Sequence, residues 1–135
     1  MYNNSLGEFV KNALLHAGCD PALIHDLDSR ATVRIELDDY PCMYVGTMSE
    51  RPVIWSDLCE FSESIVQCCS EQLLREIMAG FPFSRSGQLV LRENQGCLQI
   101  YADVTDECLQ DAKTMAEAIN AFFESQSRLM EIVRQ

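Results

Sequence analysis

The residues between Cys19 and Asp28 form the stretch of this sequence whose side chains could most readily do chemistry. It contains Cys19, Asp20, His25, Asp26 and Asp28, all of them residue types that bind metals or catalyse reactions. However, no two have the spacing of a zinc knuckle, and the stretch lacks the alternating oxygen ligands and central glycine of a calcium loop. The same residue types also accept hydrogen bonds from the backbone in turns. We therefore interpret the stretch as a turn between a helix and a strand, and we expect no metal site.

The seven cysteines are the second feature that could support catalysis. A thiol nucleophile needs a base held against it, and the two histidines, His16 and His25, both lie near the N-terminus. Cys19 is only three positions from His16, and no C-x-x-C pair is present. We expect reduced thiols that pack as small apolar groups, with no catalytic residue. A thiol-dependent enzyme that uses Cys19 or the Cys68–Cys69 pair remains the alternative from another class.

Composition and charge narrow the classes of function. The 135 residues are expected to form one domain over the range 1–135. A formal net charge of −11 argues against binding to nucleic acid or to anionic membranes. No apolar run approaches the ~20 residues of a membrane span, and the N-terminus lacks the pattern of a secretory signal. Phosphate-binding glycine motifs are also absent. We expect a cytoplasmic protein that uses no cofactor.

Hydrophobic spacing predicts three helices and five strands. In chain order these are a helix over 6–17, strands over 32–37, 42–48 and 53–58, a helix over 62–79, strands over 88–93 and 97–104, and a helix over 106–132. Gly18 ends the first helix, and residues 20–28 are predicted to be an irregular turn. The order α-β-β-β-α-β-β-α predicts an α+β fold with helices packed on antiparallel strands.

The predicted strands carry more large apolar side chains than one face of a sheet can bury. Met43 and Val45 point to one side of the second strand, whereas Tyr44 and Met48 point to the other. Two interpretations remain open. Either both faces of the sheet are buried within one subunit, or one face forms a core and the other meets a partner chain.

Several motifs, taken in order, resemble one known family. They are 18-GCDPALIHDLDS-29, the turn at Pro41, 53-VIWSDL-58, 86-SGQLVL-91 and 112-AKTMAEAINAFFE-124. With the small size, the acidity and the predicted element order, they resemble the class I chaperones of bacterial type III secretion. The narrower resemblance is to class IB, whose members serve several effectors of the invasion-type injectisome.

The resemblance implies a homodimer without enzymatic activity that binds the extended N-terminal segments of secreted effectors. It also leaves the export ATPase open as a further partner. The effector-binding residues implied are Phe9, Leu14, Ile35, Met43, Val45, Ile54 and Trp55. The dimer-interface residues implied are Ile65, Cys69, Leu73, Leu89 and Leu91. The alternative is a small cytosolic dimeric adaptor that uses the same apolar surface and is unrelated to secretion.

Overall fold

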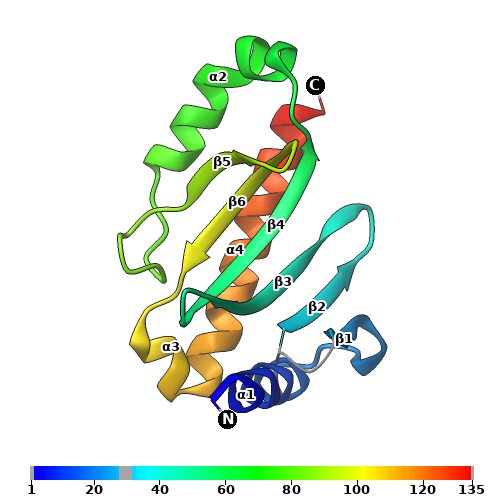
Figure 1. The fold of residues 1–135 in the computed structure, drawn as a ribbon, viewed down its shortest axis with the longest axis vertical. Helices are drawn as coiled ribbons and strands as arrows, with labels where there is room; N and C mark the ends of the chain where they lie inside the picture. Colours follow the sequence, from blue (N-terminus) through cyan, green and yellow to red (C-terminus); the bar gives the residue numbers. More distant parts are fainter. Residues whose placement is uncertain (1, 28–31, 135) are drawn as a thin grey trace.

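A computed structural model describes residues 2–27 and 32–134 (Figure 1). The first half of the chain contains α1 (Tyr2–His16), the 3-10 turn η1 (Pro21–Leu23), β1 (Ile24–Leu27), β2 (Thr32–Leu37), β3 (Tyr40–Met48) and β4 (Arg51–Glu60). The second half contains α2 (Glu63–Met78), β5 (Val90–Asn94), β6 (Cys97–Asp103), α3 (Asp106–Gln110) and α4 (Ala112–Val133).

All six strands form one antiparallel sheet in the order β1-β2-β3-β4-β6-β5. The edges of the sheet are therefore β1 and β5. The long helix α4 crosses one face of the sheet and packs on β3 and β4, with α1 beside it over β2 and β3 (Figure 1). Helix α2 lies near the far end of α4, which it contacts. The predicted α+β fold is confirmed.

The core lies between α4, α1 and the face of the sheet that they cover. Val33, Ile35, Met43, Val45 and Ile54 alternate along β2, β3 and β4, and each is at most 3% exposed. From α4, the buried stripe facing them includes Met115, Ile119, Phe122 and Leu129. The alternation predicted for β3 is thus confirmed on the helix-covered side.

The other face of the sheet carries several aromatic side chains of the strands. Cross-strand pairing forms one row across the six strands: His25, Arg34, Tyr44, Trp55, Tyr101 and Val90. The rings of Tyr44 and Trp55 stack with centroids 5.4 Å apart, and the Arg92 guanidinium lies 4.6 Å from the centroid of the Tyr101 ring. These rings remain partly exposed.

Two predicted segments differ from the structure. The turn predicted over 20–28 instead contains η1 and then β1, a strand of four residues that pairs with the edge of β2. Such a short strand gives too little periodicity to be recognised. The last helix is broken at Asp111, whose extended backbone (φ −143°, ψ 117°) separates α3 from α4. The Asp111 carboxylate accepts hydrogen bonds from Thr114 N (3.3 Å) and Oγ1 (2.7 Å), so it caps the new helix.

Candidate functional site

The stretch that first suggested chemistry has structural contacts for its described side chains. Asp20 Oδ1 accepts a hydrogen bond of 3.0 Å from Ala22 N at the start of η1. His25 Nε2 lies 2.7 Å from Glu36 Oε1 of the neighbouring strand, and Asp28 falls outside the described residues. In the part of the chain that the structure describes, no group of three or more His, Cys, Asp or Glu side chains could hold a metal ion.

The Cys19 thiol lies in surroundings that disfavour a thiolate. Its Sγ contacts the backbone carbonyl oxygen of Asp20 at 3.8 Å. Burial raises the pKa of this thiol, and the negative charge of Asp20 raises it further. A catalytic cysteine requires the opposite shift. The geometry therefore favours a packing role for Cys19 beside the pocket described next.

An apolar pocket of 290 Å³ opens where the end of α1 meets β2, β3 and α4. We call it the junction pocket; its lining includes Leu14, Cys19, Ile35, Leu37, Met43 and Phe123. Three predicted effector-binding residues, Leu14, Ile35 and Met43, are thus brought together and are at most 6% exposed. Leu37 and Phe123 also line the pocket and are more exposed. Sequence reasoning missed them because their place in the pocket becomes visible only once the burial of neighbouring side chains is known.

The other four predicted effector-binding residues lie elsewhere. Val45 and Ile54 are fully buried in the core, Phe9 is a half-buried residue of α1, and Trp55 belongs to the outer face of the sheet. Alternation along a strand tells which side chains share a face, but it does not tell which of them a covering helix leaves open to a pocket. The seven residues therefore do not form a single surface.

A second apolar hollow, of 500 Å³, lies between α2 and β5. We call it the α2–β5 groove; its lining includes Val66, Leu73, Leu74, Ile77, Leu91 and Leu98. Leu74 is 60% exposed, and nearby Met78 is 66% exposed. Of the predicted dimer residues, Leu73 and Leu91 line this groove. Sequence reasoning missed Leu74 and Met78, although apolar residues at 73, 74, 77 and 78 make a stripe wider than one packed face requires.

The three remaining predicted dimer residues pack inward. Ile65 is half-buried against the core, and Leu89 is 4% exposed. Cys69 is 6% exposed, and its Sγ lies 3.5 Å from the carbonyl oxygen of Ile132 on α4. These side chains therefore hold α2 and the residue that precedes β5 in place behind the groove.

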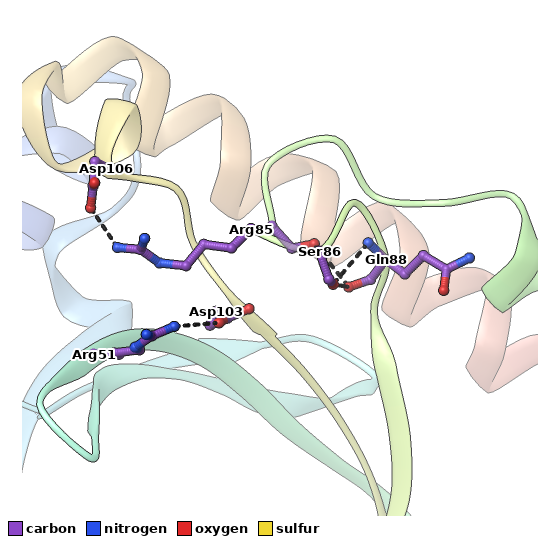
Figure 2. Close-up of polar contacts among 7 residues, drawn as sticks. Arg51, Arg85, Ser86, Gln88, Asp103 and Asp106 are labelled. Carbon is purple, nitrogen blue, oxygen red and sulfur yellow. Dashed lines mark hydrogen bonds and ion pairs between the residues drawn. The ribbon is translucent and has the colours of Figure 1, made fainter.

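The segment that joins α2 to β5 is fixed by polar contacts (Figure 2). Arg85 pairs with Asp106 at the start of α3, and Gln88 N donates a hydrogen bond of 3.3 Å to Ser86 Oγ. Nearby, Arg51 of β4 lies 3.7 Å from Asp103 of β6. In addition, Arg85 N donates a hydrogen bond of 2.9 Å to the carbonyl oxygen of Asp103. This segment leads directly into β5, so its anchoring helps to set the position of one wall of the α2–β5 groove.

A third hollow, of 540 Å³, runs between α1 and α4. We call it the α1–α4 groove. Its walls include Ala13, Ala17, Ala112, Ala116 and Ala121, with polar side chains such as His16, Lys113, Glu117 and Glu124 around them. It shares Ala17, Ala116 and Asn120 with the junction pocket, so the two hollows adjoin. Nothing in the sequence pattern indicated this groove, because alanines on two helix faces are common in cores.

Comparison with known proteins gives matches along most of the chain. A model of the invasion protein B family matches residues 18–95. Proteins named surface presentation of antigens protein SpaK, from Salmonella typhimurium (strain LT2) and Salmonella typhi, are each 33% identical over 123 residues, which is 91% of this chain and 91% of theirs.

Solved structures resemble the fold at low sequence identity. One belongs to the heterodimeric complex ExoU-SpcU from the type III secretion system of Pseudomonas aeruginosa, with a TM-score of 0.59, 19% identity, and coverage of 91% of this chain and 96% of that one. The other belongs to the HopA1-SchA chaperone-effector complex, with a TM-score of 0.59, 16% identity, and coverage of 97% and 98%. Among the described residues, no helix is long and apolar enough to cross a bilayer.

Proposed function

The chain belongs to the invasion protein B family, a family of type III secretion chaperones, and we propose that it works as a homodimer that binds several effectors. It holds the N-terminal segment of each effector in extended form, in the bacterial cytoplasm, and keeps the effector competent for secretion. It does so without nucleotide and without catalysis. The export ATPase of the secretion system is a further partner to test.

The observation that carries the guest-binding proposal is the junction pocket, which lies at the end of the sheet where the short strand β1 forms an edge. An extended peptide can add to such an edge through backbone hydrogen bonds, which demand little of its sequence. One or more apolar side chains of the guest then enter the pocket against Leu14, Ile35 and Met43. Binding through the backbone plus an apolar anchor suits a protein with several clients.

The α2–β5 groove supports the dimer. Leu74 and Met78 are large apolar side chains exposed on α2, and Val90 is exposed on the outer face of the adjacent edge strand β5. Exposed apolar patches of this kind mark interaction sites, and a two-fold axis lets the same patch meet itself. Leu73 and Leu91 lie in the groove between the two elements. The proposed interface is therefore built from Leu73, Leu74, Met78, Val90 and Leu91.

Affinity capture of the chain from its native bacterium, with identification of the proteins that co-purify, tests the proposal. We expect secreted proteins whose isolated N-terminal fragments bind without ATP. Cys19→Glu places a charge in the junction pocket and should abolish this binding, whereas Ala22→Glu, on the exposed turn η1 outside the pocket, should leave it unchanged. If no secreted protein co-purifies, or if binding requires a folded domain, the adaptor alternative replaces the chaperone proposal.

A further inference from the structure

The α1–α4 groove is a hollow that the proposed extended guest does not use. It is larger than the junction pocket, at 540 Å³ against 290 Å³. Because the two share Ala17, Ala116 and Asn120, they form a continuous trough that starts beside β2 and β3 and continues between the two helices. A segment anchored in the junction pocket can therefore continue along α4.

The walls of the groove are made of small side chains on both helices. Five alanines line it: Ala13 comes from α1, Ala17 directly follows the end of α1, and the other three come from α4. Facing helices normally interdigitate longer side chains, so that protein interiors contain few voids. Here the alanines leave space and allow another backbone to approach closely. Ala112 and Ala121 remain partly exposed, so this surface is reachable from outside.

Two acidic residues determine which kind of segment fits. Glu117 and Glu124 are both exposed and both line the groove. They lie seven positions apart on α4, which is two helical turns or about 10.5 Å along the axis. Within the described ranges 2–27 and 32–134 neither carboxylate has an ion-pair partner. The groove thus offers an apolar floor and, on α4, two carboxylates without an ion-pair partner among the described residues. The exposed Lys113 of the same helix and His16 of α1 also line it, so the carboxylates outnumber the lysine by two to one.

We propose that the α1–α4 groove binds a second, basic and helical segment of the effector, next to the extended segment held at the junction pocket. Small apolar residues on one face of that helix pack on the alanines. Lysine or arginine residues spaced two turns apart pair with Glu117 and Glu124, because the same spacing on both helices brings the charges together. This inference rests on the proposed function and adds the chemistry of a second recognition element.

Binding of a synthetic peptide to the full chain, measured by isothermal titration calorimetry, tests the chemistry directly. The probe is a helical peptide of lysine, alanine and leucine, with its lysines on one face and two turns apart; its counterpart carries glutamate in place of lysine. We expect the lysine peptide to bind and the glutamate peptide not to bind. The double variant Glu117→Gln/Glu124→Gln should weaken binding by about 3- to 10-fold, as expected for the loss of two exposed ion pairs.

Two further variants test whether peptide binding depends on the shape of the groove or only on the overall negative charge of the protein. Ala121→Leu fills the α1–α4 groove without touching the junction pocket and should also weaken the lysine peptide. Glu107→Gln/Glu131→Gln removes the same charge from exposed positions outside the groove and should have no effect. Equal binding of the two peptides, or equal losses in the two double variants, would overturn the inference.

Effector fragments from the affinity capture then distinguish failure of this inference from failure of the proposed function. If Glu117→Gln/Glu124→Gln and Ala121→Leu bind these fragments as the wild type does while Cys19→Glu does not, the second element is refuted and the chaperone proposal stands. If Cys19→Glu also binds normally, the junction pocket is not the guest site and the proposed function fails with it. Weakening by the groove variants supports the inference.

Discussion

Gln126 of α4 donates a hydrogen bond of 2.8 Å from Nε2 to Ser56 Oγ of β4, and both side chains are fully buried. Nε2 also donates to the carbonyl oxygen of Pro41 (2.7 Å), and Ser56 Oγ donates to that of Cys42 (3.0 Å). The long helix is thereby tied to two strands through polar contacts in an otherwise apolar layer. Gln126 Oε1 finds no hydrogen-bond partner among the described residues.

Replacing Gln126 tests how much these contacts contribute to stability. Gln126→Ala leaves a cavity and removes the donor from Ser56 and Pro41, so we expect a loss of about 2–4 kcal/mol in the free energy of unfolding. Gln126→Met conserves volume and removes the unpaired Oε1, so it should cost less. Urea unfolding followed by circular dichroism measures both. Equal losses in the two variants would show that volume plays no part.

Gly46 of β3 has no room for a side chain. A Cβ atom there would lie 2.8 Å from Thr32 Oγ1 and 3.2 Å from the Trp55 ring. We expect Gly46→Ala to reduce the free energy of unfolding by about 1–3 kcal/mol, as overpacking does. Adding Thr32→Ala should restore part of the loss, whereas Thr32→Ser keeps the clashing hydroxyl and should restore little. A double-mutant cycle by urea denaturation measures the coupling.

The cap at Asp111 makes stability depend on pH in the acid range. The hydrogen bond from the Thr114 side chain lowers the pKa of the Asp111 carboxyl, so the folded state favours the charged form. Its contribution is therefore present above the unfolded pKa of ~3.9 and is lost as pH falls through the lower folded value. Asp111→Asn keeps an acceptor without the charge. We expect the Tm of the wild type to fall more steeply than that of this variant below about pH 4.

The exposed apolar side chains of α2 predict a dimer that single charges can break. We expect Leu74→Glu and Met78→Glu to give folded monomers, because each would bury a charge at the interface. Gln72→Glu adds the same charge on an exposed part of α2 outside the groove and should leave the dimer intact. Sedimentation velocity measures the three variants. A dimer that survives both substitutions would place the interface elsewhere.

The thiol of Cys19 provides a probe of the junction pocket. Since burial and Asp20 raise its pKa, its alkylation should be slow at neutral pH and should accelerate as pH rises above the ordinary thiol value of ~8.5. A bound effector fragment should slow it further, while alkylation of the exposed Cys68 on α2 should not change. Mass spectrometry of the labelled peptides measures both sites. Unchanged labelling of Cys19 in the complex would argue against a guest in this pocket.

The sequence predicted the strands and main helices well because their patterns are long. Alternation along β3 correctly placed Met43 and Val45 on the same face, although it did not tell that helices cover this face; Gly18, with φ at 93°, ends the first helix as expected. The short strand β1 was missed because it depends on pairing with β2. The break at Asp111 was missed because it depends on a single capping carboxylate. The pockets were not predictable from pattern either, since they depend on how closely α1 and α4 approach the sheet and each other.

The sheet order sets a length requirement on any guest that contacts two subunits. Strands β1 and β5 lie on opposite edges, and at ~4.8 Å between neighbouring strands the six-stranded sheet is about 24 Å wide. If two chains join at their β5 edges, their β1 edges lie about 50 Å apart. An extended chain covers ~3.3 Å per residue, so at least about 15 residues are needed to bridge the two sites. Shorter segments can reach only one of the two subunits. The dimer therefore sets a minimum length for the extended segment of an effector that contacts both.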